Sequence, residues 1–418
     1  MLRSVGYGPK LLRDFNELNL LRYIKEYGPL SRAELAKAYK ISKATVSEIV
    51  AMLLESSFVK EIGRGETGKL GGRRPILLEF NRRAGYSIGV EIKRNHARVA
   101  LTDLDANIID KSMIRFKSGT ALENVLDQVI EQIENLKETN WAADAIPMGI
   151  GVSIPGLIDY TKGCISESDT LKNWEDVPIK QRLMDALQID TFIENDVKAM
   201  TLGEFHFGHG RNYKNLVYLW TGDGLGAGIV INGQLYRGVS ASSGEVGFYE
   251  LGYYIRSAEE FALLFNGQTN FAQILSEQGL VAAAVRGVKS NIDTCLSERE
   301  VTLDSILSAA EQNDTFSLEL ISQYAGLIGI LSINLINTLN PEILIIGSEH
   351  VSKTPLLIKL IREKVKKDQL HIPIKSVDIE AASLNEYAGI LGSAALVLDD
   401  IFYNSQLNLR RYRRLFKA

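Results

Sequence analysis

The first part of the chain has the apolar spacing of helices. Its first apolar stripe follows one helix face up to Gly28-Pro29, a helix stop signal, and consists of Leu11, Leu12, Phe15, Leu18, Leu21 and Ile24. Ser31-Arg32-Ala33-Glu34 has the form of a capping box, which predicts a second, short helix. Ser42 is expected to cap a third helix, whose apolar face is formed by Val46, Ile49, Val50, Leu53 and Leu54.

The pattern after the third helix predicts a β-hairpin. Residues 58–62 and 75–80 have the composition of strands, and the turn between them is rich in glycine and basic residues. Three helices followed by a hairpin are typical of a winged helix-turn-helix DNA-binding domain, here residues 1–82. A three-helix protein-interaction module is the alternative. The agreement of caps, apolar stripe and basic turn favours the DNA-binding domain.

The outward face of the third helix carries small or cationic side chains, which can enter a major groove of DNA. Arginines in the hairpin suit phosphates or a minor groove. The candidate DNA-binding residues are Arg32, Ser42, Lys43, Ala44, Thr45, Ser47, Arg64, Arg73 and Arg74.

From residue 83 onward, strand and helix patterns alternate. Strands are predicted over 86–91, 97–103, 108–116, 147–154, 191–194, 216–220 and 227–231. We expect an α/β body of two lobes that flank a cleft, 83–195 and 196–418, with the last helix returning to the first lobe.

Charge divides the chain at the same place. Residues 1–83 hold 16 Lys and Arg against 9 Asp and Glu, whereas the remainder holds 31 against 42. This asymmetry indicates a nucleic-acid-binding module joined to an acidic body, with chance clustering of surface charge as the alternative.

Cysteine usage and hydropathy argue against a disulfide-rich protein, a metal-binding protein and a membrane protein. The two cysteines, Cys164 and Cys295, form no CxxC motif and predict neither a disulfide framework nor a metal site. No apolar run approaches about 18 residues, so we expect a cytoplasmic protein without a membrane partner.

The segment Gly222 to Gly228 is a glycine loop of the kind that cradles phosphates, but it contains Asp223. An ionised carboxylate a few Å from a triphosphate repels it by roughly 1 to 4 kcal/mol per charge pair. The loop therefore has the form of a phosphate site and a charge that opposes phosphate.

Several motifs together resemble the repressor, open-reading-frame and sugar kinase (ROK) family and, within it, the transcriptional regulators. Those of the N-terminal domain are Ser31 to Ala36, Ser42 to Ser47 and Gly71 to Pro75. Those of the body are Pro155 to Asp159, Glu194-Asn195-Asp196, the glycine loop, Ser243 to Gly247, Asn340-Pro341-Glu342 and Ile345-Ile346-Gly347. The resemblance implies an actin-like, ribonuclease-H-like two-lobed sugar-kinase fold behind the winged helix-turn-helix.

The chain departs from the family's kinases where ATP would bind. Their first strand ends in Asp-Ile-Gly-Gly-Thr, and the same place here reads Glu91-Ile92-Lys93-Arg94-Asn95. Long side chains in place of glycines obstruct phosphates. We expect Lys93 and Arg94 to lie on a solvated hairpin tip, and we expect no cofactor and no catalytic residue.

The part of the site that binds sugar in the family keeps more of the family's residues than the part that binds ATP. The resemblance implies effector contacts by Gly156, Asn195, Asp196, Glu245, Phe248 and Glu259. In the kinases Asp196 would match the general base. Phe248 replaces a zinc-bridging histidine and can stack on the C–H face of a pyranose. The alternative is that these polar residues are structural remnants in an empty cleft.

The combined expectation is a sugar-responsive transcriptional regulator, a repressor of carbohydrate genes such as those for xylose use, acting without catalysis. Its partners are operator DNA, a monosaccharide and a second copy of the chain, as a homodimer or dimer of dimers. The alternatives are an active sugar kinase with a fused DNA-binding domain, and a body that binds no sugar and serves only for dimerisation.

Overall fold

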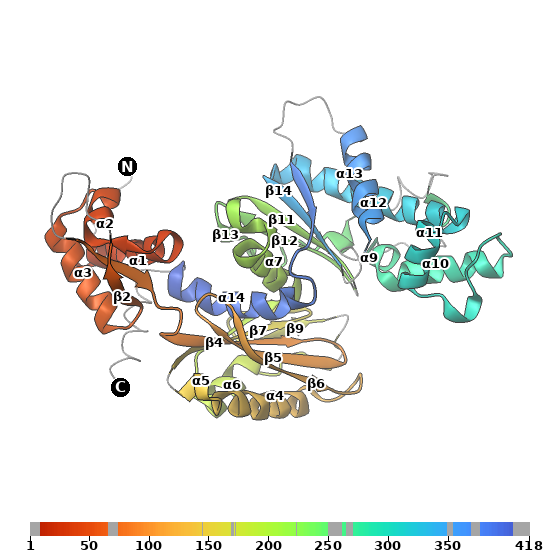
Figure 1. Cartoon of the computed structure of the whole chain (residues 1–418). Coiled ribbons are helices and arrows are strands. Elements are labelled where there is room, and N and C mark those ends of the chain that lie inside the picture. The colour runs from red at the N-terminus through yellow and green to blue at the C-terminus, as the bar shows by residue number, and fades with distance from the viewer. Residues whose placement is uncertain are drawn as a thin grey trace, which may run out of the picture.

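A computed structural model describes residues 9–65, 74–143, 145–168, 171, 173–222, 224–249, 261–264, 271–348, 354–368 and 377–403. These residues form one three-stranded, two five-stranded and one two-stranded sheet. Figure 1 shows the N-terminal domain beside a body in which helices separate the two large sheets. The predicted fold class is confirmed.

The N-terminal domain has the predicted helices and hairpin. The helices are α1 (Pro9–Tyr27), α2 (Arg32–Tyr39) and α3 (Lys43–Glu55), and the strands β1 (Leu30–Ser31), β2 (Val59–Arg64) and β3 (Ile76–Phe80) form a sheet in the order β1-β3-β2. Ser31 and Glu34 form the complete capping box, and Ser42 caps α3 by accepting from the Thr45 N–H. The short strand β1 was not predicted, because two residues carry no periodicity.

The first large sheet has the order β10-β7-β4-β5-β6. Its strands are β4 (Gly85–Ile92), β5 (His96–Asp103), β6 (Ile108–Arg115), β7 (Ile146–Ile154) and β10 (Thr191–Asn195). The helices α4 (Leu122–Lys137), α5 (Asn140–Ala143) and α6 (Ile179–Leu187) belong to this lobe, as does the hairpin of β8 (Leu157–Asp159) and β9 (Cys164–Glu167). β10, β7 and β4 run parallel, so their carboxyl ends meet at one edge, where an α/β sheet places a ligand site.

The second large sheet has the order β13-β12-β11-β14-β15. Its strands are β11 (Leu216–Thr221), β12 (Leu225–Ile231), β13 (Gln234–Leu235), β14 (Ile343–Gly347) and β15 (Asp378–Ala381). The helices α9 (Phe271–Leu275), α10 (Glu277–Lys289), α11 (Leu303–Glu311), α12 (Thr315–Leu339) and α13 (Pro355–Asp368) complete the lobe. Of the helices described, α12 alone is long and apolar enough to cross a membrane, and 72% of its apolar window is buried inside the protein.

Two helices lie between the large sheets, α7 (Asp196–Phe207) and α14 (Ala388–Phe402) (Figure 1). α14 packs on β4 and β7, α7 packs on β11 and β12, and the two helices pack on each other. The approach is so close that a Cβ at Gly151 would lie 1.8 Å from the Ser393 carbonyl oxygen, and one at Gly392 would lie 1.9 Å from that of Ala199. Glycine at these two positions is therefore required for the helix pair to fit.

The end of α14 joins the body to the N-terminal domain. Phe402 and Leu398 belong to the same buried cluster as Leu21, Ile24 and Phe80. Arg22 of α1 donates a hydrogen bond to the Phe402 carbonyl oxygen. The DNA-binding domain thus shares one continuous apolar core with α14.

Candidate functional site: the interlobe cleft and the DNA-binding face

The turn from β10 into α7 places two of the predicted effector residues. Asn195 is the N-cap of α7, and its Oδ1 accepts from the Lys198 N–H at 3.1 Å. Its Nδ2 donates to the Gly156 carbonyl oxygen at 3.1 Å. Gly156 has φ +122°, and a Cβ there would lie 2.7 Å from the Glu167 carbonyl oxygen. The structure therefore brings Gly156, Asn195 and Asp196 together at the carboxyl edge of the first sheet.

Lys93 is not on a solvated tip, and that prediction is wrong. Its side chain is 16% exposed, and its Nζ lies 3.6 Å from Asp196 Oδ2 and 3.8 Å from Glu91 Oε1. The ammonium also lies 5.4 Å from the centroid of the Trp220 ring, which belongs to the second lobe. Two carboxylates and an aromatic face stabilise the cation between the lobes, whereas its neighbour Arg94 is exposed as predicted.

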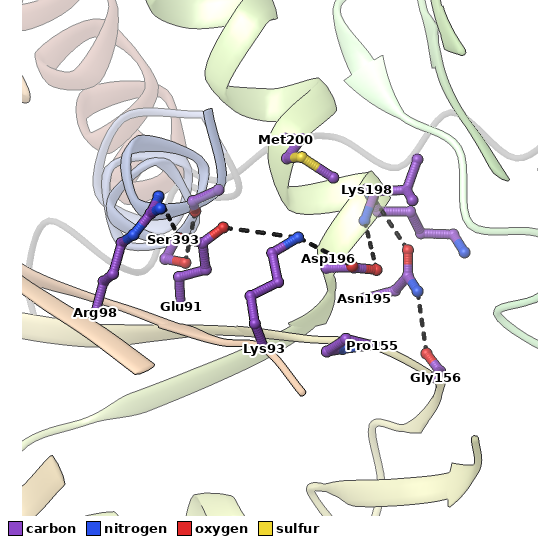
Figure 2. A network of polar contacts seen from close by, with 12 residues as sticks. Glu91, Lys93, Arg98, Pro155, Gly156, Asn195, Asp196, Lys198, Met200 and Ser393 are labelled. Atoms are coloured by element: carbon purple, nitrogen blue, oxygen red, sulfur yellow. Dashed lines mark hydrogen bonds and ion pairs between the residues drawn. The ribbon is translucent and has the colours of Figure 1, made fainter. Parts of the chain in front are cut away.

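The charges alternate from Arg98 through Glu91 and Lys93 to Asp196. Glu91 Oε2 lies 3.3 Å from Arg98 Nη1, and Arg98 also donates to the Glu386 carbonyl oxygen. Figure 2 shows the resulting row of Arg98, Glu91, Lys93 and Asp196, which ends at the first turn of α7. Glu91 is 4% exposed in its side chain, so its charge is held in place by these two cations rather than by water.

A second buried charge cluster fixes the other side of the β10–α7 turn. The Glu194 carboxylate accepts from Tyr160, from Arg237 Nε at 2.7 Å and from the Asn195 N–H at 2.9 Å. Burial and the Glu194 charge raise the pKa of Tyr160, which stays a neutral donor. Burial is the largest effect on the pKa of Arg237 and would lower it, but the charges and hydrogen bonds of Glu194 and Tyr160 together raise it. Arg237 follows β13, so this cluster ties the two lobes together.

Glu245 and Phe248 lie in the loop after β13. Gly244 has φ +86°, and a Cβ there would lie 1.7 Å from the Ala227 carbonyl oxygen, so this loop packs closely on β12. Phe248 is 67% exposed, and nothing in the described part of the chain covers its ring fully. Glu259, the sixth predicted effector residue, and Asp223 of the glycine loop lie outside the described residues.

Sequence reasoning missed Lys198, which lies in the first turn of α7 and is only 2% exposed. Its ammonium makes no hydrogen bond or ion pair within the described ranges, and burial lowers its pKa against the opposing effect of Glu194, Glu245 and Asp196. Figure 2 shows the side chain directed away from Asp196. The available signal was a lysine within an otherwise apolar helix segment directly after Glu194-Asn195-Asp196.

The predicted DNA-binding residues gather on one domain, but some side chains are exposed and others are engaged in contacts within the domain. Lys43, Ala44 and Ser47 are exposed on α3, and Arg64 and Arg74 are exposed where the described parts of the hairpin end. Ser42 and Thr45 hydroxyls bond each other at 2.8 Å, and Arg32 pairs with Glu61 of β2 at 2.9 Å. Arg73 lies outside the described residues. Arg32, Ser42 and Thr45 therefore have a local structural role besides any contact with DNA.

Comparisons with known proteins agree with both parts of the structure. The ROK family profile matches residues 87–400, and the winged helix-turn-helix DNA-binding profile matches residues 13–60. The chain belongs to the ROK family. A xylose repressor of Bacillus subtilis is 30% identical over 93% of this chain and 96% of its own length.

Two solved structures show the same body with and without the N-terminal domain. A ROK family transcriptional regulator, described as a homologue of the Escherichia coli MLC protein, has a TM-score of 0.81 at 21% identity and covers 97% of this chain and 100% of its own. A ROK family glucokinase from Streptomyces griseus, solved with glucose and AMPPNP, has a TM-score of 0.61 at 21% identity. It covers 75% of this chain and 99% of its own.

The residues of this ROK chain do not fit the nucleotide of the family's kinases. At the end of β4, where the kinases have glycine, the Lys93 side chain fills space and pairs with Asp196, the residue that would serve as general base. A phosphate would need room beside this turn, and the Lys93 side chain takes up that room in place of a glycine. Nor do they fit the kinases' zinc, because Phe248 has no atom that can ligate a metal.

Proposed function

We propose that this chain is a sugar-responsive transcriptional repressor that regulates carbohydrate genes without catalysing a reaction. The observation that carries the proposal is the paired state of Asp196. The carboxylate that a kinase would use as a base has a resident counter-ion, Lys93, in place of a phosphoryl donor. The site can still accept hydrogen bonds from hydroxyl groups, and its fold is that of a sugar kinase.

The contacts of α7 and α14 supply a route from this site to DNA. Asp196 begins α7, and near the other end of that helix His206 Nε2 lies 2.6 Å from Asp399 Oδ1 of α14. α14 then ends at Phe402 in the core of the DNA-binding domain. A sugar that binds one arrangement of the lobes more tightly than the other would shift the position of α14 and of the domain attached to it.

The size of this shift sets the difference in binding free energy that the sugar must supply. To move the repressor from mostly DNA-bound to mostly free, the sugar must favour the free form by about 5.5 kcal/mol for a change from 99:1 to 1:99. In a homodimer, two copies of α3 would meet DNA about one helical turn apart, near 34 Å, and a small rotation of each would break that spacing. We propose such a dimer in the cytoplasm, with a palindromic operator.

One relative indicates which sugar to test first. The Bacillus subtilis protein that matches over nearly the full length is a xylose repressor, so D-xylose is the first sugar to test. The relatives that match more than nine-tenths of this chain include two repressors, which favours the repressor function over that of a kinase with a fused domain.

The test is a titration of the full chain onto a fluorescent duplex from the region upstream of its own gene, with D-xylose and D-glucose added separately. The proposal expects tight binding that one of the sugars changes by tenfold or more. A coupled assay of ATP consumption with the same sugars should stay at background. Sugar-dependent turnover would overturn the non-catalytic part, and duplex binding unaffected by any sugar would favour a simple dimerisation body.

A further inference from the structure

A cavity of about 270 Å³ lies beside the last strand of the first large sheet. Two successive residues of β10, Phe192 and Ile193, line it. Neighbouring side chains of a strand point to opposite faces, so the cavity follows the free edge of β10, which ends that sheet. Leu396 of α14 adds a further apolar wall. The volume is close to the lower limit of about 300 Å³ for small-molecule sites, so the cavity suits a ligand of few atoms.

The polar walls of the cavity come from three parts of the body. Tyr160 follows β8 and Lys180 lies in α6, both of the first lobe, whereas Arg237 belongs to the second lobe and Asp399 to α14. The described walls contain none of the predicted effector residues, so the cavity is separate from the site proposed for the sugar. A ligand in it would contact both lobes and the helix between them.

Lys180 supplies a cation without a counter-ion. In the part of the chain that the structure describes, the ammonium of this half-buried residue forms no ion pair or hydrogen bond. Arg237 is already offset by Glu194, whose Oε2 accepts from its Nε at 2.7 Å. That bond uses one of the five N–H donors of the guanidinium, so further donors can bind a second acceptor. Lys180 and Arg237 together therefore favour one carboxylate, with charge-assisted hydrogen bonds from both.

Asp399 limits the rest of the ligand's chemistry. Its Oδ1 lies 2.6 Å from His206 Nε2, so a basic group already occupies this carboxylate and a ligand ammonium is not needed there. A ligand hydroxyl can still donate a hydrogen bond to Asp399 without adding charge. A phosphate ester carries about −1.5 to −2 charges at pH 7, which is more than the one unpaired charge of Lys180 offsets. A single carboxylate matches it.

We infer that this cavity is a second binding site, for a small monocarboxylate that bears hydroxyl groups. The carboxylate would lie between Lys180 and Arg237, and a hydroxyl would donate to Asp399. The carbon atoms would pack on the apolar walls, which are Phe192, Ile193 and Leu396. The inference does not depend on the proposed sugar response, and neither does its test.

Calorimetric titration of the full chain with a series of three-carbon compounds tests the ligand class. D-Glycerate has a carboxylate and two hydroxyls. Glycerol lacks the carboxylate, D-serine has an ammonium in place of one hydroxyl, and glycerol 3-phosphate has a phosphate ester in place of the carboxylate. At constant ionic strength we expect D-glycerate to bind at least tenfold more tightly than each of the others. The inference is overturned if any of the others binds as tightly or more tightly, or if D-glycerate does not bind.

Variants test whether the ligand lies in this cavity. Lys180→Met keeps most of the side chain and removes its charge, and should weaken D-glycerate binding about tenfold or more, as loss of a charge-assisted hydrogen bond does. Lys162→Met is the matched control, because it removes a lysine that is 66% exposed, pairs with Asp176 and does not line the cavity. Its affinity should stay within twofold. An unchanged affinity in Lys180→Met would overturn the assignment, and the comparison of compounds on the wild type remains decisive if that variant does not fold.

Discussion

The two ends of the α7–α14 pair are held in different ways. At the end proposed to bind the effector, the first turn of α7 meets Lys93 and the Glu194 cluster through charges and hydrogen bonds. At the DNA-binding end, α14 meets the N-terminal domain mainly through buried apolar side chains around Phe402. Polar contacts can be exchanged for those of a ligand at little cost, whereas apolar packing cannot. Under the proposed function, the end of the helix pair at Asp196 is therefore suited to respond to a ligand and the end at Phe402 to transmit the response.

The largest effect on stability is expected where the end of α14 packs on the N-terminal domain. Phe402 is fully buried and packs edge-on against Phe80 with ring centroids 5.7 Å apart. Phe402→Ala should destabilise the protein by about 3–5 kcal/mol, and calorimetry should then separate the melting of the DNA-binding domain from that of the body. Tyr403→Ala is the matched control, since Tyr403 is 46% exposed and should lose much less. Equal losses of unfolding free energy in the two variants would contradict the conclusion that apolar packing around Phe402 joins α14 to the N-terminal domain.

The next effect is expected in the charge cluster that ties the lobes. Glu194→Gln keeps the shape of the side chain but leaves Arg237 without its counter-ion, and should cost about 3 kcal/mol in chemical denaturation. Arg237→Met in the same background should cost little more, because the partner is already lost. If the losses of unfolding free energy from the two substitutions add in the double variant, Glu194 and Arg237 are not coupled.

A smaller effect of opposite sign is expected for Lys198. Burial lowers its pKa below the ordinary value, so the folded state is destabilised at pH values where the lysine is protonated in the unfolded chain. Lys198→Met should raise the free energy of unfolding by about 1 kcal/mol at pH 7. The gain should shrink as the pH rises towards the ordinary lysine pKa, and a gain that is constant from pH 7 to 10 would refute this cause.

The smallest effect on stability, and none on the proposed sugar site, is expected in the hairpin. Arg73→Ala together with Arg74→Ala should weaken binding to all DNA sequences and reduce the slope of log affinity against log salt by about 1 to 2. Arg94→Ala, on an exposed turn of the body, is the control. An unchanged salt slope would remove the hairpin from the DNA-binding face.

The N-terminal domain was largely predictable, and the cleft was only partly so. Caps at Ser31 and Ser42 and the apolar stripe of α3 are local signals, which tertiary contacts reinforce here. Asn195 and Asp196 were found through a motif. Lys93 was misplaced because its partners, Asp196 and Trp220, are far away in the sequence, and no local pattern shows that a turn of one lobe faces the other lobe. Lys198 was missed although it stands in an otherwise apolar helix segment, because a single lysine in such a segment usually faces solvent and here it is buried.

The most direct test of the account measures duplex binding and ATP consumption in one sample, with sugar added at saturation. The account predicts that an uncharged sugar changes the fluorescence anisotropy of the duplex while the ATP concentration stays constant, and that Asp196→Asn abolishes the response but not DNA binding. Consumption of ATP that depends on the sugar and is lost in Asp196→Asn would contradict it.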